Sequence, residues 1–105
     1  MALTANQRLC KQPGEKRKFE MSFASVLGTS ESISSITSVA SEKVGGYDSD
    51  LTITSTGLVS AAPTTTVEMY VAGGTLGSTY RIEVLVNTDA SQILEGDGIL
   101  YVTDQ

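Results

Sequence analysis

A glycine-rich corner between two alternating segments is the feature that most constrains how this chain can fold. Residues 65–72 and 80–86 each alternate apolar and polar side chains, which is typical of half-buried β-strands. Three glycines stand between the two segments, at Gly73, Gly74 and Gly77. In β-sandwiches a tyrosine placed like Tyr80 turns its hydroxyl back to an upstream backbone carbonyl and locks the corner. We therefore predict a sandwich with Tyr80 as a fold lock and the glycines in tight or positive-φ conformations.

Similar patterns predict strands before this corner. Residues 16–23 alternate, and the side chains expected to face inward are Phe19, Met21 and Phe23. Residues 33–39 carry apolar side chains three apart, as a helix would, but the serines between them are poor helix formers. We therefore predict a strand there, with a bulge near positions 34–35.

Glycines are also expected to separate the later strands. A strand at residues 51–55 should turn at Gly57, and a final strand at residues 99–103 should follow a turn at Gly96–Gly98. Short strands with a turn signal roughly every ten residues are typical of antiparallel sandwiches. The 105 residues suffice for one all-β domain.

Charge is distributed unevenly along the chain. Residues 1–18 contain five Lys or Arg against one Glu, so their net charge is +4, whereas residues 19–105 contain two against eleven acids and carry −9. We expect residues 1–14 to form a basic arm and residues 15–105 to form the sandwich domain. The arm reaches a partner's acidic surface or stays a solvated tail. The candidate basic contacts are Arg8, Lys11, Lys16, Arg17 and Lys18. Nucleic acid is not the expected partner, because the body is acidic and the arm has no aromatic residue before Phe19.

The sequence offers little for catalysis beyond carboxylates that could serve as an acid–base pair. The chain has no histidine and one cysteine, Cys10, which excludes a Ser-His-Asp triad, an imidazole metal site and an internal disulfide. Two short acidic pairs occur, Asp48 with Asp50 and Glu95 with Asp97. We expect both to lie in plain solvated turns and not to bind a cation. No apolar run approaches the length of a membrane span, and the N-terminus lacks the apolar core of a signal peptide. We expect no catalytic residue, cofactor or metal, no membrane contact, and a protein that is not an enzyme.

Several apolar side chains have an uncertain orientation. Tyr70, Leu85, Leu100 and Val102 either all face outward, where they would mark a subunit interface, or one strand is shifted in phase by one residue. Tyr70 and Leu85 are the candidate partner contacts from this set.

Residues 15 to 103 resemble the small immunoglobulin-like virion proteins of tailed bacteriophages, described as fiber-tail adaptor proteins. The block that carries the resemblance is Thr65-Thr66-Val67-Glu68-Met69-Tyr70-Val71-Ala72-Gly73-Gly74-Thr75-Leu76-Gly77-Ser78-Thr79-Tyr80. The segment Gly28-Thr29-Ser30-Glu31-Ser32-Ile33 matches an earlier turn, and Phe23 matches an aromatic residue before it. Two features differ: Ile36 is the nearest occupant of the usual tryptophan position, and Glu95-Gly96-Asp97-Gly98 replaces an arginine-rich segment.

The resemblance implies an immunoglobulin-like antiparallel sandwich of seven or eight strands. It also implies a non-enzymatic structural component of a tailed-phage virion, made in the host cytoplasm. Such a protein would act as an adaptor in the neck, tail or fiber-attachment region and assemble with other virion proteins, as a homo-oligomer. One alternative is a capsid decoration protein. Another is a carbohydrate- or cell-surface-binding module, although four tyrosines and no tryptophan make a thin aromatic platform.

Overall fold

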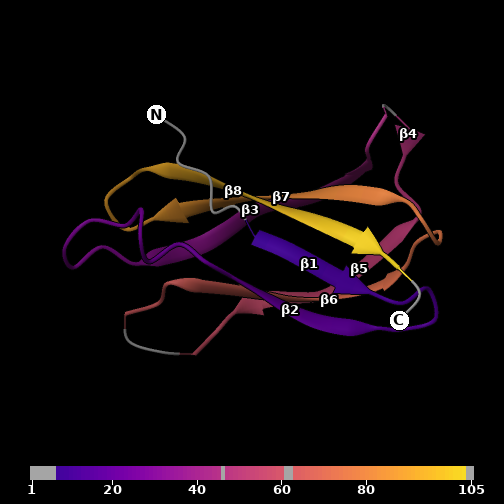
Figure 1. Cartoon of the computed structure of the whole chain (residues 1–105). Helices are drawn as coiled ribbons and strands as arrows, with labels where there is room; N and C mark the ends of the chain where they lie inside the picture. Colours follow the sequence, from indigo (N-terminus) through magenta and orange to yellow (C-terminus); the bar gives the residue numbers. More distant parts are fainter. Residues whose placement is uncertain (1–6, 46, 61–62, 104–105) are drawn as a thin grey trace.

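The structure is a computed structural model and describes residues 7–45, 47–60 and 63–103 (Figure 1). It consists of eight strands: β1 (Gln7–Lys11), β2 (Arg17–Ser22), β3 (Ile33–Lys43), β4 (Tyr47–Asp48), β5 (Leu51–Leu58), β6 (Thr66–Gly73), β7 (Thr79–Thr88) and β8 (Ile93–Val102). The described residues include no helix long and apolar enough to cross a membrane.

The strands form two sheets that pack face to face. One sheet has five strands in the order β1-β8-β7-β3-β4, and the other has three in the order β2-β6-β5. Figure 1 shows them as an upper and a lower layer, with β1 at the front of the upper one. Apart from the parallel pairing of β1 with β8, the paired strands run antiparallel. The predicted all-β sandwich is confirmed.

The core lies between the layers and follows the period-two pattern of the sequence. β6, β7 and β8 alternate buried side chains with partly exposed ones along most of their length. As predicted for β2 and the residue that follows it, Met21 and Phe23 are buried and Phe19 packs against the core. The core side chains are Met21, Phe23, Ile33, Val67, Met69, Val71, Tyr80, Ile82, Val84, Val86, Leu94, Leu100 and Val102.

The predicted turn at Gly96–Gly98 is wrong, because β8 is one continuous strand through both glycines. Gly96 faces inward, and a Cβ atom there would lie 2.5 Å from Met21 Sδ and 2.8 Å from Phe23 Cζ. The glycine therefore provides the room in which the Phe23 ring packs against the backbone of the opposite sheet. Of the two alternatives for Tyr70, Leu85, Leu100 and Val102, the structure supports a shift of phase on one strand, because Leu100 and Val102 of β8 are fully buried.

The predicted turn at Gly57 is also wrong. β5 continues to Leu58, and the irregularity appears instead as a shift in its register against β6 between Thr54 and Gly57. Ser55 has a φ of 53° inside this bulge. The bulge predicted near positions 34–35 is confirmed by a register shift between Ile33 and Ser35, and a second shift follows in the same strand.

The expectation of a separate N-terminal arm needs correction where the structure describes it. Residues Gln7–Lys11 form β1, which pairs with β8 from Gln7 opposite Gly98 to Lys11 opposite Val102. These five residues are therefore an edge strand of the five-stranded sheet. Residues 1–6 lie outside the described residues.

Substituting Gly96 tests the packing of Phe23. We expect Gly96→Ala to lower the free energy of unfolding by about 1–3 kcal/mol, because its methyl group would collide with Met21 and Phe23 in a filled core. Gly57→Ala is the matched control, since a Cβ atom there meets nothing within 4 Å. Chemical denaturation of both variants measures the difference. Equal stability of the two variants would contradict this account of Gly96.

Candidate functional site

Tyr80 lies at the start of β7, and its ring is completely buried. The hydroxyl donates a hydrogen bond to Asp50 Oδ1 at 2.5 Å and accepts one from the Thr75 backbone N–H at 2.8 Å. Thr75 Oγ1 donates to Asp50 Oδ2 at 2.6 Å. The prediction of an upstream carbonyl as the hydroxyl's partner is therefore wrong. The partners are an upstream amide and a carboxylate that precedes β5.

Asp50 was expected to be a plain solvated turn residue, and the structure gives it a structural role. Hydrogen bonds from Thr75 and then Tyr80 hold the pKa of its carboxyl below the ordinary value. The nearby Lys43 charge acts in the same direction. Asp50 thereby connects the entry to β5, in the three-stranded sheet, with the corner that leads into β7, in the five-stranded sheet.

The three glycines of the corner all have positive φ, at 80° for Gly73, 95° for Gly74 and 85° for Gly77. Two of them also allow close packing. A Cβ atom on Gly73 would lie 2.7 Å from the Asp50 carbonyl oxygen, and one on Gly74 would lie 2.9 Å from Val102 Cγ2. Gly77 has open space around it, so only its backbone conformation calls for glycine.

Lys11 was expected to contact a partner, but the structure buries it completely. Its ammonium donates to the carbonyl oxygens of Gly73 at 2.6 Å and Gln12 at 2.7 Å, with Pro13 O at 3.4 Å. Burial lowers the pKa of this amine, and the Glu15 charge opposes the shift. Lys11 thus ties β1 to the end of β6 and offers no surface to a neighbour.

The other basic candidates gather where β2 begins. Lys16, Arg17 and Lys18 are all exposed, and we call them the basic end of β2. The Lys16 ammonium lies 5.6 Å from the centre of the Tyr70 ring, which is itself 36% exposed. The side chain of Arg8 is not among the described ones.

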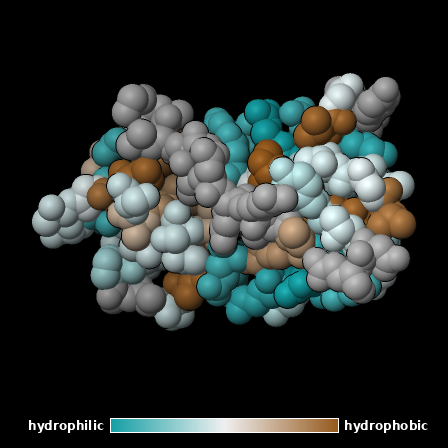
Figure 2. All heavy atoms as spheres, in the orientation of Figure 1, coloured by the Kyte–Doolittle hydropathy of each residue, from teal (hydrophilic) through white to brown (hydrophobic). Residues whose placement is uncertain are grey.

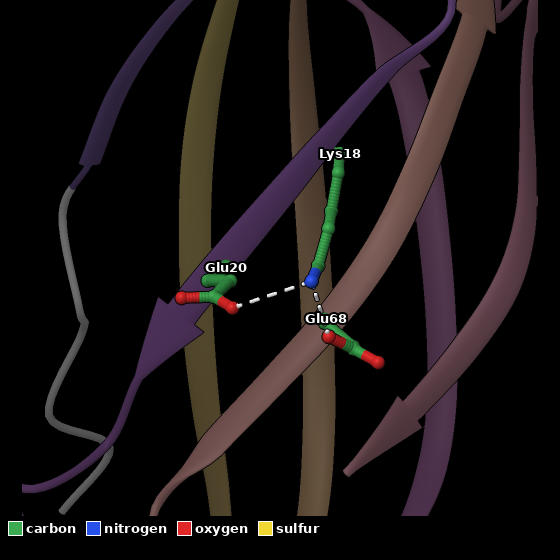
Figure 3. A network of polar contacts seen from close by, with 3 residues as sticks. All are labelled: Lys18, Glu20 and Glu68. Atoms are coloured by element: carbon green, nitrogen blue, oxygen red, sulfur yellow. Dashed lines mark ion pairs between the residues drawn. The ribbon is translucent and has the colours of Figure 1, made fainter. Parts of the chain in front are cut away.

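Lys18 is the member of the basic end whose charge is balanced within the chain. Its Nζ lies 3.0 Å from Glu68 Oε2 and 3.8 Å from Glu20 Oε2 (Figure 3). The hydrogen bond and charge of Glu68 raise the pKa of Lys18. Lys16 and Arg17 have no ion pair among the described side chains, so they present the uncompensated positive charge of this end.

The outward face of β7 and β8 carries a group of carboxylates. Oxygens of Glu83, Glu95 and Asp97 lie within 4.8 Å of one another, and we call these residues the acidic strip. Burial, followed by the charges of Asp97 and Glu83, raises the pKa of Glu95. Arg81 lies 3.6 Å from Glu83 and 3.3 Å from Glu42. The spacing of the strip would suit a cation, but the nearby guanidinium already supplies positive charge, and no other feature points to an ion.

Glu31 was not singled out from the sequence, yet it is a buried carboxylate, 6% exposed. It accepts hydrogen bonds from Thr88 Oγ1 at 2.5 Å, the Gly28 N–H at 2.7 Å and Gln92 Nε2 at 3.0 Å. These bonds, the one from Thr88 above all, lower the pKa of Glu31. Glu31 therefore fastens the loop before β3 to the turn between β7 and β8. The sequence signal was a Gly-x-x-Glu spacing, which is too common to identify such a role.

Leu85 and Tyr70 face outward, on opposite sheets. Leu85 is half-buried opposite Glu95, and Tyr70 lies between Lys18 and Thr54 on the neighbouring strands. The described surface also has an open depression lined by Ala40, Ser41, Glu42, Arg81 and Glu83. The one hydroxyl in this lining, Ser41 Oγ, donates its hydrogen bond to Ser49 Oγ at 2.7 Å instead of to a carboxylate, so the depression has the character of a binding surface.

Comparison with protein families matches residues 11–101 to the family described as podophage GP4 fiber-tail adaptor protein gp77. The chain belongs to this fiber-tail adaptor family. It is a structural, non-enzymatic adaptor of the podophage virion and a component of its tail. The searches of curated proteins and of solved structures found no match for the adaptor. The match spans β2 to β7 and most of β8, so it covers both candidate surfaces and the Tyr80 corner.

Removing the Tyr80 hydroxyl tests its role as a fold lock. We expect Tyr80→Phe to lower the melting temperature by several degrees, because the Thr75 amide and the Asp50 carboxylate each lose a partner at a cost of about 1–3 kcal/mol. Tyr70→Phe removes a hydroxyl from an exposed ring of the same kind and should leave the melting temperature unchanged. Thermal unfolding followed by circular dichroism compares them. If the two variants melt together, Tyr80 is not a lock.

Glu31 makes stability depend on pH in a definite direction. Its pKa is lowered in the folded state, so its contribution is present above the ordinary carboxyl pKa and disappears as pH falls through the folded-state value. Glu31→Gln should therefore be less stable than wild type at pH 7, and the gap should narrow on acidification below about pH 4. Glu20→Gln, at an exposed carboxylate of β2, is the control that should show no such convergence. Urea unfolding at a series of pH values measures both gaps, and a gap for Glu31→Gln that stays constant would refute this role.

Proposed function

We propose that the adaptor acts as a passive connector, a homo-oligomer whose subunits contact neighbouring virion proteins through exposed sheet surfaces. The observation that carries this proposal is the basic end of β2 beside Tyr70. Lys16 stacks on an exposed tyrosine ring, and Arg17, which is exposed opposite Val71, has no ion-pair partner among the described side chains. Tyrosine and arginine are enriched at protein interfaces, where an amphipathic ring and a planar cation contribute much of the binding energy.

The fold proposed for this connector is immunoglobulin-like. The order β8-β7-β3-β4 has the strand sequence of an immunoglobulin G-F-C-C′ sheet, and β2-β6-β5 has that of a B-E-D sheet. Tyr80, at the start of β7, then occupies the corner before strand F. The parallel β1–β8 pair adds the first strand to the same sheet as G.

Outward side chains suit this role better than a catalytic one. On the three-stranded sheet, the face around Tyr70 presents lysines, carboxylates and threonines that alternate with the buried residues of β6. Such a face holds neighbours by shape and charge, and each exposed ion pair contributes only about 0–1 kcal/mol. Because the same contacts are repeated around an assembly, a small binding free energy per subunit is sufficient to hold the assembly together.

A phage that lacks the adaptor gene tests the function. We expect its particles to have tails without fibers and to adsorb poorly to host cells, and wild-type adaptor supplied in trans should restore both. A variant with Lys16→Glu and Tyr70→Ala should fold but fail to restore fibers. Thr52→Ala, exposed on the same sheet, should restore them. Electron microscopy counts the fibers per particle. Normal fibers on adaptor-free particles would rule out the proposal, and intact tails with fragile capsids would favour a decoration protein.

A further inference from the structure

The outward face of the five-stranded sheet combines uncompensated negative charge with apolar area. Its acidic strip has one guanidinium nearby, that of Arg81, which is shared between Glu42 and Glu83. Among the described residues, Asp97 Oδ1 is buried and has no hydrogen-bond partner. This oxygen is shielded from solvent, so the negative charge that a partner would meet is that of the three half-buried carboxylates as a group.

Apolar side chains flank the acidic strip on the same face. Ile93 is 65% exposed near the start of β8, while Leu85 and Ile99 are half-buried on either side of the carboxylates. In the described part of the chain, both sheets account for all strands, so no third layer of secondary structure covers this face. An uncovered face with an apolar fringe and an excess of negative charge is suited to a protein partner of positive charge.

The same chain carries the complementary surface at another place. The basic end of β2 belongs to the three-stranded sheet, whereas the acidic strip points outward from the opposite layer (Figure 1). Figure 2 shows hydrophilic residues gathered over β2 at the bottom of the view and over the five-stranded sheet at the top. One molecule cannot bring these two surfaces together, but two molecules can.

We propose that a second copy of the adaptor docks on this face, its Lys16 and Arg17 against the partner's Glu95 and Asp97. This inference rests on the proposed homo-oligomer and names the surfaces that build it. The contact joins two different patches, so it is heterologous, and it leaves one acidic and one basic surface free at the ends of each pair. Repeated contacts of this type close into a ring when the rotation per subunit allows.

The charge of the chain favours its own copy as the occupant. Among the side chains that the structure describes, the exposed basic ones lie at the basic end of β2, and acids dominate the remaining body, so each molecule supplies both halves of the contact. Burial and then the charges of Asp97 and Glu83 raise the pKa of Glu95, and the Arg81 charge only partly opposes the shift. An incoming lysine or arginine would add positive charge against this remaining repulsion.

Two charge-neutralised variants test the contact in the full chain. One carries Glu95→Gln with Asp97→Asn, and the other carries Lys16→Gln with Arg17→Gln. Wild-type adaptor should assemble in a concentration-dependent way that high salt weakens, and each variant should associate at least about tenfold more weakly. An equimolar mixture of the two variants should form dimers that grow no further, because it contains one intact pair of surfaces. Sedimentation velocity in buffer with a chelator measures all these species.

Matched controls separate the effect of a change in net charge from the effect of where that change is made. Thr56→Lys with Ser60→Lys changes the charge by the same +2 as the acidic-strip variant, and Thr56→Glu with Ser60→Glu matches the other variant. Both positions are exposed, at β5 and just after it, and these controls should assemble like wild type.

Four results would overturn the inference: a variant that assembles like wild type, a mixture that stays monomeric, a wild-type protein that is monomeric at every concentration, or assembly that the chelator abolishes. The last result would assign the acidic strip to a divalent cation. Because these measurements use purified protein, they leave the fiber counts on adaptor-free particles as a separate test of the proposed function.

Discussion

The hydroxyl of Tyr80 is the point on which the arrangement of the two sheets depends. It lies in the buried interior, yet its two hydrogen bonds reach the corner after β6 and the residue that precedes β5. These two groups belong to different parts of the chain, and the buried hydroxyl needs them because a buried polar group without a partner is costly. Tyr80 therefore fixes how the strands enter both layers. The positive φ values of Gly73, Gly74 and Gly77 give the corner the shape that brings Thr75 to the hydroxyl.

Short-range sequence patterns correctly predicted the features that depend on neighbouring residues. Alternation identified the buried faces of β2, β6 and β7, and the serine-rich composition of β3 identified a bulged strand instead of a helix. The errors arose where a distant residue decides the structure. The sequence around Gly96 is typical of a turn, but Gly96 lies in the middle of a strand. Its missing side chain leaves space that the Phe23 ring occupies from the opposite layer. The β1 strand and buried Lys11 were missed for the same reason, because their partners lie about 90 and 60 residues away.

The same contrast between features set by neighbouring residues and features set by distant ones applies to the candidate surfaces. The sequence located Lys16, Arg17, Lys18, Tyr70 and Leu85, since charge and alternation are visible without a structure. It did not reveal the acidic strip, whose members come from two strands and whose Glu95 and Asp97 were assigned to a turn. A tail adaptor needs such surfaces more than it needs a cavity, because it connects proteins and converts no substrate. The hydrogen bonds of the buried Glu31 and Lys11 are made within the chain, whereas the exposed Lys16 and Arg17 have no ion pair among the described side chains.

The parallel pairing of β1 with β8 has a consequence for the timing of assembly. β1 is the first strand to leave the ribosome and β8 is the last of the eight, so the five-stranded sheet stays incomplete while the chain is being synthesised. Contacts between such distant segments also fold slowly, because a long loop must close before they form. Until β8 arrives, its outward carboxylates and the fully buried Lys11 have no place in a sheet. The acidic strip, which combines Glu83 of β7 with Glu95 and Asp97 of β8, therefore forms only after translation has passed the final strand.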